Sequence, residues 1–492
     1  MATHDDAGKA RETMATDLKF GTSGLRGPVS ELDGPPAQSW TRAFLALLER
    51  RGDIRPGDGV LVGYDLRASS PAIAGRVHGA IRAAGFDALD CRAVPTPALA
   101  LRAMEQGLPA IMVTGSHIPE DRNGLKFYRA DGEIDKRDET GIVAIHSGPP
   151  LPDAPRRGEL RTLPDILGRY SARYLDFVGR EALTGLRVGV YQHSSVARDL
   201  IVDLLSALGA EAVPLGRAQA FIPVDTEALR PEDVALLHRF AGKGGFDAIV
   251  STDGDADRPL IADEAGRFVR GDLVGAMTAA RLEADAVVTP VTSNSALEAC
   301  GLFREVVRTR VGSPYVIEGM AAAVRSGAAR VVGFEANGGV LLASPVEGEG
   351  RRLAALPTRD AMLPIVCVLS EVARSGMPLS QLAARFGFRA TASGRLREVP
   401  SRASAPFLDR LEHDDAYRRE LLADLGMIDS VDARDGVRIL SADGRTVHFR
   451  VSGNAPEVRC YVEAADEGQV VALLRWSLDI ARAEIDKLET AR

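Results

Sequence analysis

The sequence has 492 residues but only four cysteines, Cys91, Cys300, Cys367 and Cys460. No two of them lie close enough in the chain to form a zinc knuckle or a redox pair. Each lies beside apolar residues, which is typical of buried free thiols. Nothing in this cysteine pattern demands an oxidising compartment.

Long apolar runs are also missing. No stretch approaches the roughly 18 apolar residues that a membrane-spanning helix needs. The first twenty residues are polar and charged, without the apolar segment of a secretory signal. We therefore expect a cytoplasmic protein that has no membrane partner.

Basic residues are not in excess: the net charge is −8 and the pI is near 5.7. A general nucleic-acid binder needs a basic face, so we expect no nucleic-acid partner. The chain has no Walker A motif and no GxGxxG after a strand, and nothing in it indicates ATP or NAD binding. Any phosphate site must then be a local basic cluster.

What is present is a globular composition, with 45% hydrophobic residues. Short apolar runs alternate with longer helical patterns such as 71–85 and 195–209, which indicates βαβ units. The strand-like runs are residues 59–65, 110–115, 186–191, 247–252, 285–291 and 330–336.

Polar breaks at 146–159, 263–272 and 385–394 divide the chain. Residues 435–453 read as a hairpin with its turn at Asp443-Gly444, and 466–489 as an amphipathic helix. The predicted fold class is α/β, with three α/β domains and a smaller α+β C-terminal domain. The expected domains are 1–153, 154–269, 270–385 and 386–492.

The strongest chemical feature is DGDADR, residues 253–258, which places three carboxylates at alternate positions after an apolar strand. Oxygen ligands in such a loop suit Mg²⁺ or Ca²⁺. An EF-hand is the first alternative, and it fails because Arg258 stands where its glycine should be and strand precedes the loop. A solvated acidic loop is the second alternative.

A second feature is VTGSHIPEDRNGLKFY, residues 113–128. Ser116 follows an apolar strand in a loop rich in turn residues, where its hydroxyl can be presented to a substrate. The alternatives are an ordinary turn serine and a Ser-His-Asp hydrolase. The hydrolase is disfavoured because Ser116 and His117 are neighbours, and neighbours seldom act as nucleophile and base.

Two further loops offer groups for a sugar phosphate. FRVSGNAPEVRCYVEA, residues 449–464, combines arginines, a hydroxyl and glycine, as a phosphate clamp would, although an ordinary hairpin with surface arginines has the same pattern. GFEANGG, residues 333–339, suits sugar hydroxyls but is also a plain turn. FGTSGLRG (20–27) and YDLRASSP (64–71) each add an arginine among small residues.

Taken together, five of these loops resemble those of the α-D-phosphohexomutase family, and they occur in the family's order. FGTSGLRG is similar to the family's opening loop, and TGSHIPEDRNGLK to its TASHNP…NGxK phosphoserine loop. DGDADR resembles its metal loop, GFEANGG its sugar loop and RVSGNAPEVR its RPSGTEPxxR phosphate loop. The resemblance implies mixed sheets in four domains that surround a central cleft, with one loop from each domain.

The resemblance also implies the roles of residues. Ser116 would carry a phosphoryl group, and Mg²⁺ would be held by that phosphoserine with Asp253, Asp255 and Asp257. The other residues expected to be catalytic are Arg26, Lys126, His117 and Arg258. The residues expected to bind substrate are Glu335, Asn337, Arg310, Arg450, Ser452, Gly453, Asn454 and Arg459.

Several positions depart from the family pattern. Gly115 and Ile118 replace the usual Ala and Asn of the serine loop. Gly339 stands where some bacterial members have a histidine proposed to transfer protons, which leaves the general base unassigned. Asn454-Ala455 replaces Thr-Glu in the clamp, and Arg310 stands where lysine is common.

The implied activity is the interconversion of mannose 6-phosphate and mannose 1-phosphate through a hexose 1,6-bisphosphate, which would also act as activator. The spelling of the sugar and phosphate loops is most like a bacterial phosphomannomutase subgroup. Phosphoglucomutase activity and a non-catalytic sugar-phosphate sensor are the alternatives, and we expect a monomer or small homo-oligomer.

Overall fold

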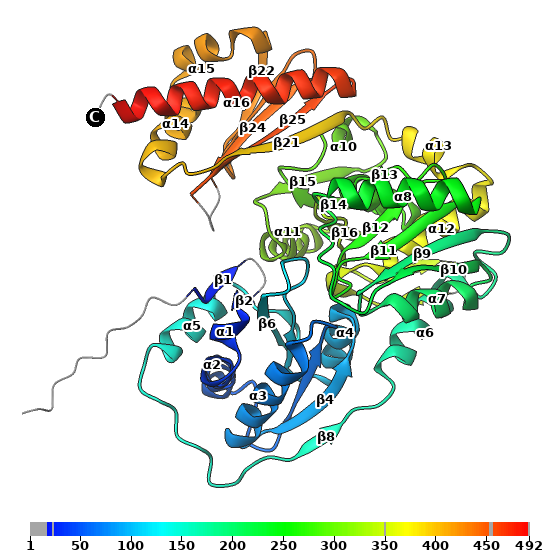
Figure 1. The fold of residues 1–492 in the computed structure, drawn as a ribbon, viewed down its shortest axis with the longest axis vertical. Coiled ribbons are helices and arrows are strands. Elements are labelled where there is room, and N and C mark those ends of the chain that lie inside the picture. The colour runs from blue at the N-terminus through cyan, green and yellow to red at the C-terminus, as the bar shows by residue number, and fades with distance from the viewer. Residues whose placement is uncertain (1–16, 22–23, 349–350, 452–455, 491–492) are drawn as a thin grey trace, which may run out of the picture.

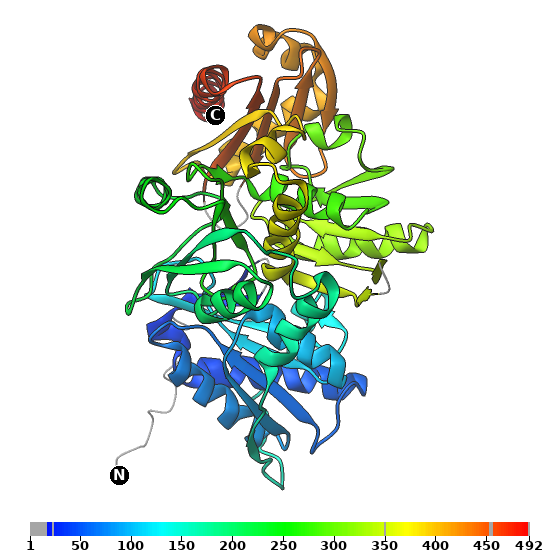
Figure 2. The ribbon, with the colours of Figure 1, turned by 90° about the vertical axis from the view of Figure 1, so that its right-hand side faces the viewer.

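The computed structural model describes residues 17–21, 24–348, 351–451 and 456–490. Four groups of strands and helices follow one another along the chain, from the blue group at the bottom of Figure 1 to the orange and red group at the top. The same stacking is visible after a quarter turn (Figure 2). These groups match the fold class predicted from the sequence, three α/β units and one α+β unit.

The first unit is a mixed eight-stranded sheet in the order β1-β2-β6-β5-β3-β4-β8, with β7 paired to β6. Its strands are β1 (Lys19–Gly21), β2 (Gly24–Pro28), β3 (Gly59–Tyr64), β4 (Asp87–Ala93), β5 (Ala110–Val113), β6 (Arg122–Arg129), β7 (Gly132–Glu133) and β8 (Leu160–Thr162). Its helices are α1 (Val29–Leu32), α2 (Pro35–Arg51), α3 (Ser70–Ala83), α4 (Thr96–Gln106) and α5 (Lys136–His146).

The edge strand β8 belongs to the first sheet, because it pairs in parallel with β4. It nevertheless lies beyond the domain boundary expected at residue 153. All three of its residues are exposed, so no apolar alternation marks it as a strand. The first sheet therefore extends into the segment expected to begin the second domain.

The second unit is a five-stranded sheet in the order β10-β9-β11-β12-β13. Its strands are β9 (Arg187–His193), β10 (Glu211–Arg217), β11 (Ala248–Thr252), β12 (Pro259–Ala262) and β13 (Phe268–Val269). Its helices are α6 (Ile166–Val178), α7 (Arg198–Ala207) and α8 (Pro231–Gly244).

The third unit is a five-stranded sheet in the order β15-β14-β16-β17-β20, with a separate β18-β19 pair. Its strands are β14 (Ala286–Pro290), β15 (Glu305–Thr309), β16 (Val331–Phe334), β17 (Val340–Leu342), β18 (Val346–Gly348), β19 (Arg351–Leu353) and β20 (Leu356–Asp360). Its helices are α9 (Gly271–Arg281), α10 (Ala296–Ala299), α11 (Ser313–Arg325), α12 (Met362–Ser375) and α13 (Leu379–Ala384).

The C-terminal unit is an antiparallel sheet in the order β21-β25-β24-β23-β22. Its strands are β21 (Ala390–Leu396), β22 (Ile428–Asp432), β23 (Val437–Ser441), β24 (Thr446–Val451) and β25 (Val458–Ala464). Its helices are α14 (Ser401–His413), α15 (Asp415–Leu421), the 3-10 turn η1 (Ala423–Leu425) and α16 (Glu467–Thr490). The predicted hairpin and final helix are both confirmed.

One topological feature recurs in the first three sheets. Each has a buried strand that runs parallel to its neighbour, ends in a loop, and is followed by an antiparallel strand. The loop after β5 carries Ser116, the loop after β11 carries Asp253–Arg258 and the loop after β16 carries Glu335. Equivalent turns of three sheets therefore supply three of the motif loops.

The first three units share an apolar core that runs without interruption from Leu99 in α4 through Tyr174 in α6 to Ile365 in α12. The C-terminal unit has its own core around Phe407 and Phe449. Polar contacts connect it to the third unit: Ser295 Oγ donates to Glu463 Oε2 at 2.5 Å, and Asn294 Nδ2 to the Arg389 carbonyl at 3.0 Å. The apolar core of the C-terminal unit is therefore separate from the core that the other three units share.

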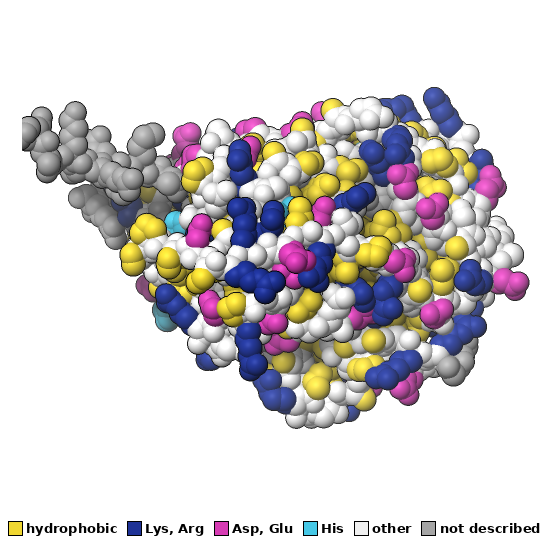
Figure 3. All heavy atoms as spheres, turned by 90° about the horizontal axis from the view of Figure 1, so that it is seen from below, with side chains coloured by type: hydrophobic (Ala, Val, Ile, Leu, Met, Phe, Trp, Pro, Cys, Tyr) yellow, Lys and Arg dark blue, Asp and Glu magenta, His cyan; other side chains and the backbone are white. Residues whose placement is uncertain are grey.

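Charged side chains of both signs are interspersed with apolar ones on the face drawn in Figure 3. Within the part of the chain that the structure describes, no helix is both long and apolar enough to cross a membrane.

The separate C-terminal core leads to a stability prediction. Phe449 is fully buried and packs edge-on against Phe407, with ring centroids 5.3 Å apart. Phe449→Ala should cost about 3–5 kcal/mol and lower the melting temperature of the C-terminal unit alone. Scanning calorimetry should then resolve an early transition, whereas Val471→Ala, at an exposed site of α16, should leave the trace unchanged. A trace that shifts as one single transition would contradict the independent core.

Candidate active site

The site is built around Ser116, which lies in the loop after β5. Its backbone is in the left-handed region, with φ at 55°, which non-glycine residues seldom adopt. Its amide donates to Thr114 Oγ1 at 2.8 Å, and its hydroxyl donates to Asp253 Oδ2 at 2.6 Å. The serine loop of the first sheet and the acidic loop of the second therefore meet at this hydroxyl.

The serine loop is held from behind by Arg67, which is fully buried. Its guanidinium donates to four backbone carbonyls of the loop, those of Ser116 (2.9 Å), Ile118 (2.6 Å), Pro119 (2.7 Å) and Arg122 (3.0 Å). A Cβ at residue 115 would lie 2.6 Å from Arg67 Cζ, so Gly115 leaves room for this arginine and an alanine there would displace it.

Phe221 of the second unit covers the other face of the Arg67 guanidinium at 4.0 Å. Asp65 Oδ2 accepts from Arg67 Nε at 3.2 Å and fixes the arginine from its own loop. The position of Ser116 thus depends on a buried arginine that contacts both units.

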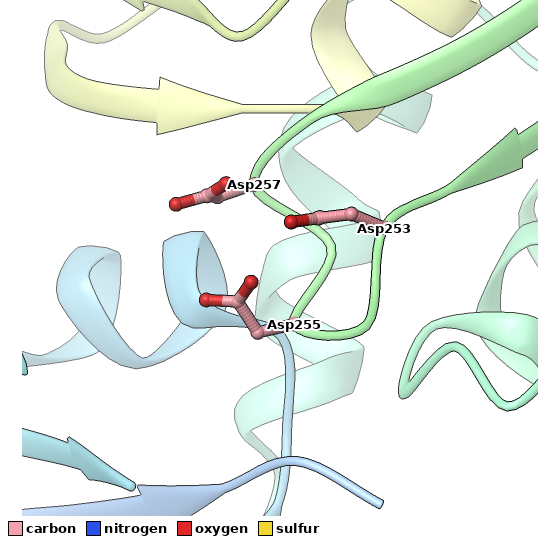
Figure 4. A group of neighbouring side chains, drawn as sticks. All are labelled: Asp253, Asp255 and Asp257. Carbon is pink, nitrogen blue, oxygen red and sulfur yellow. The ribbon is translucent and has the colours of Figure 1, made fainter. Parts of the chain in front are cut away.

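Asp253, Asp255 and Asp257 form a buried group, with ligand oxygens that all lie within 4.8 Å of one another. They project from one short loop after β11 (Figure 4). Asp255 Oδ1 and Asp257 Oδ1 are buried and, among the described residues, have no hydrogen-bond partner. Unpaired buried carboxylate oxygens are costly, so this loop is suited to hold a metal ion.

The charge balance of the triad supports this interpretation. Burial and the neighbouring Asp255 and Asp257 raise the pKa of Asp253 well above its usual range. Burial acts in the same direction on Asp257, but Arg359 and Lys126 hold the pKa of that carboxyl below its usual range. Three buried carboxylates thus need positive charge from outside their own loop.

Lys126, from β6, supplies part of that charge. Its Nζ donates to Asp255 Oδ2 and to Asp257 Oδ2, each at 2.6 Å. Thr96 Oγ1, at the start of α4, also donates to Asp255 Oδ2 at 2.5 Å. Two elements of the first unit are therefore bonded directly to the acidic loop of the second.

Positive groups also surround Ser116. Arg258 Nη1 lies 3.0 Å from His117 Nδ1, which is 3.2 Å from Ser116 Oγ. Burial and the nearby Arg258 and Arg26 lower the pKa of His117, so this ring is neutral at physiological pH. Burial and Arg258 also lower the pKa of Arg26, to about 10. A buried cation whose pKa is lowered by a neighbouring cation marks a site prepared for an anion.

The sugar loop meets the acidic loop through Arg359 in β20. This arginine donates to Asp257 Oδ2 from Nη2 at 2.9 Å and to Glu335 Oε2 from Nη1 at 3.0 Å. Although burial acts against the charged form, Asp257 and Glu335 raise the pKa of Arg359 well above its usual range. Asn337 Nδ2 lies 3.5 Å from Glu335 Oε2.

Arg450 and Arg459 are cross-strand neighbours on β24 and β25. Arg450 Nε donates to Asp435 Oδ1 at 2.8 Å, and Arg459 Nε donates to Glu457 Oε1 at 2.9 Å. Arg310 Nε donates to the Arg434 carbonyl at 2.9 Å, which brings it to the same joint between the third and C-terminal units. Ser452, Gly453 and Asn454 lie outside the described residues.

A cavity lies between the sugar loop and the C-terminal sheet. It is lined by Ala336 of the sugar loop, Arg270 before α9, and His448 and Tyr461 of the C-terminal sheet. The predicted residues that the structure describes thus form a tight cluster around Ser116 and a second, arginine-rich cluster at the joint between the third and C-terminal units.

The sequence interpretation missed three residues at this site. Arg67 was noted only as an arginine among small residues, and Arg359 and Thr96 lie outside the motif loops. All three act on loops that are distant in sequence, so a local pattern could not indicate them.

Family models now give this geometry a context. The descriptions that match are phosphoglucomutase/phosphomannomutase alpha/beta/alpha domain I at residues 17–148, domain II at 171–266, domain III at 270–387, and the C-terminal domain at 398–475. The chain belongs to the phosphoglucomutase/phosphomannomutase family. It is therefore a phosphohexomutase, an isomerase.

Relatives within this family match almost the whole chain. A phosphomannomutase from Sinorhizobium fredii is 45% identical and covers 95% of this chain and 99% of its own length. A phosphomannomutase from Salmonella muenchen is 39% identical, covering 96% and 97%. A phosphoglucosamine mutase from Symbiobacterium thermophilum is 30% identical, covering 95% and 99%.

Solved structures agree on the fold. A phosphoglucomutase/phosphomannomutase family protein from Burkholderia thailandensis superposes with a TM-score of 0.76 at 23% identity, covering 95% of this chain and 97% of that one. The open form of a Paramecium phosphoglucomutase gives 0.73 at 18% identity, covering 95% of each chain.

The Arg67 network predicts a local effect on dynamics. Arg67→Met removes the donors to four carbonyls of the serine loop, so amide hydrogen exchange at residues 116–122 should accelerate on the order of tenfold or more. Arg76→Met, at an exposed arginine of α3, is the control and should leave this exchange unchanged. Equal exchange in both variants would show that Arg67 does not hold the loop.

Proposed function

We propose that this phosphohexomutase interconverts mannose 6-phosphate and mannose 1-phosphate, through a phosphoserine at Ser116 and a hexose 1,6-bisphosphate that also serves as activator. The observation that carries the proposal is the 2.6 Å contact between Ser116 Oγ and Asp253 Oδ2, inside a buried carboxylate triad ringed by cations. The identity of the relatives supports the choice of mannose.

Mg²⁺ is the proposed metal, held by Asp253, Asp255, Asp257 and the phosphoserine. Oxygen-only ligands fit a hard divalent cation, and Asp255 Oδ1 and Asp257 Oδ1 are buried without a hydrogen bond from any described residue. When bound, the ion supplies Lewis-acid stabilisation of charge on the phosphoryl group.

The residues around Ser116 would stabilise and direct the transfer. A sugar hydroxyl forms a bond to phosphorus as the bond from phosphorus to Ser116 Oγ breaks. Arg26, Lys126 and Arg258 provide fixed positive charge for the phosphoryl oxygens. The hydroxyl proton ends on Ser116 Oγ, which can then donate to Asp253 Oδ2 as it does in the structure.

The second cluster would hold the phosphate that does not react. Arg310, Arg450 and Arg459 supply guanidinium donors, and Ser452, Gly453 and Asn454 complete the proposed clamp. Glu335 and Asn337 of the sugar loop would bind the sugar hydroxyls. After the first transfer the bisphosphate must turn so that its other phosphate returns to Ser116, which movement of the C-terminal unit, with its separate core, would permit.

We also propose that the domains divide at residues 153, 269 and 385, although β8 of the next segment completes the first sheet. The proposed location is cytoplasmic, and the proposed state is a monomer or small homo-oligomer. Its substrate is a hexose phosphate.

The test of the phosphoserine is Ser116→Ala. Intact-mass spectrometry should find a wild-type fraction heavier by one phosphoryl group, mapped to Ser116, and the alanine variant should lose both that fraction and all mutase activity. Ser206→Ala, at an exposed serine of α7, should keep both. Full activity of Ser116→Ala would refute the mechanism.

A coupled assay with mannose 1-phosphate and glucose 1-phosphate side by side tests which sugar is preferred. Faster turnover of glucose 1-phosphate would make the chain a phosphoglucomutase.

The clamp predicts a different kinetic signature. Its contacts persist from ground state to transition state, so Arg459→Ala should raise KM more than it lowers kcat. The loss in kcat/KM should be about tenfold to a hundredfold, with phosphorylation of Ser116 retained. Arg475→Ala, at an exposed arginine of α16, is the matched control. An unchanged KM with a collapsed kcat would place Arg459 at the reacting centre.

A further inference from the structure

Arg359 lies where loops from two different sheets meet. Its side chain is only 2% exposed. Nε and Nη2 both donate to Asp257 Oδ2, at 3.1 and 2.9 Å, and Nη1 donates to Glu335 Oε2 at 3.0 Å. One guanidinium therefore joins the acidic loop of the second sheet to the sugar loop of the third.

Gly339 provides the room for this side chain. A Cβ at residue 339 would lie 2.8 Å from Arg359 Cδ, 2.9 Å from Arg359 Cγ and 2.9 Å from the Asp257 carbonyl oxygen. Gly339 is not in the left-handed region, so its backbone conformation does not demand glycine. The absence of a side chain at residue 339 is therefore explained by the space that Arg359 and the Asp257 carbonyl occupy.

Lys126 does not duplicate this link. It also donates to Asp257 Oδ2, but its second carboxylate partner is Asp255, in the same loop. Arg359 instead reaches Glu335, which belongs to another sheet. The relative position of the two loops thus depends on the arginine in a way that the lysine cannot replace.

We infer that Arg359 is a positioning residue for the mutase reaction, which sets Asp257 and Glu335 relative to each other, and that Gly339 is its steric counterpart. The inference rests on the proposed function for the roles of those two carboxylates. A guanidinium has donors only and keeps its charge, so Arg359 acts by position and not by proton transfer. Metal binding and sugar binding should therefore be coupled through one side chain.

The test compares Arg359→Met and Arg359→Lys with Arg418→Met, a control that removes a mostly buried arginine of α15 remote from Ser116. Calorimetric titration measures binding of Mg²⁺ and, separately, of mannose 1-phosphate to dephosphorylated protein. Arg359→Met should weaken both on the order of tenfold or more, because both carboxylates lose a charged donor. Arg359→Lys keeps the charge, but its single ammonium group can contact only one of Asp257 and Glu335. It should therefore partly restore either Mg²⁺ affinity or mannose 1-phosphate affinity, and not both.

Gly339→Ala approaches the same link from the other side. Its methyl group should displace the Arg359 stem and weaken both affinities. The double variant of Gly339→Ala and Arg359→Met should lose less affinity than the sum of the losses in the two single variants, because both changes act on the same link. Normal affinities for both ligands in Arg359→Met, or losses no greater than in Arg418→Met, would overturn the inference.

A ligand-free measurement separates this inference from the proposed function. Amide hydrogen exchange at residues 335–339 should accelerate in Arg359→Met and Gly339→Ala but not in Arg418→Met. If the wild-type protein neither binds nor converts hexose phosphate, the proposed function is refuted. The hydrogen exchange at residues 335–339 would still test whether Arg359 links the two loops. Unchanged exchange at 335–339 would overturn the link itself.

Discussion

The arrangement of the first three units depends on the burial of three carboxylates in one loop. Asp253, Asp255 and Asp257 are at most 1% exposed, and their oxygens lie within 4.8 Å of one another. Such a concentration of negative charge away from water is stable only with cations close by. Lys126 comes from the first sheet and Arg359 from the third, so neutralising this one loop ties three sheets together. The continuous apolar core around α4 and α6 fits the same requirement for a fixed arrangement.

The C-terminal unit follows a different principle. Its core is separate, and hydrogen bonds connect it to the third unit, among them the one that Val311 donates to Asp435 Oδ2 at 2.8 Å. The same Asp435 accepts from Arg450 at 2.8 Å, so the joint and an arginine of the proposed clamp share one carboxylate. Three units that share one core, beside a unit with a core of its own, suit a reaction whose intermediate must turn without leaving.

Much of this could be predicted from the sequence because the informative patterns are local. Ser116, Asp253 and Glu335 each lie at or just after the end of an apolar run, so each run could be assigned as a strand and the residues after it as a loop that carries the motif. The edge strand β8 could not, because three exposed residues carry no alternation. Arg67, Arg359 and Thr96 could not either, because each has a bonding partner in a motif loop that lies at least 49 positions away in the chain. Gly115 and Gly339 stood out as departures from the family pattern, and only the positions of Arg67 and Arg359 give them a physical reason.

The central claim is that the buried triad is a divalent-cation site on which the catalytic centre is assembled. A calorimetric titration of Mg²⁺ into chelator-treated wild-type protein is the test of this claim. We expect one bound ion per chain, and loss of that binding in Asp255→Asn, which removes the charge of a carboxylate whose buried Oδ1 accepts no hydrogen bond from the described residues. Absence of binding to the wild type, or equal binding by both proteins, would contradict it.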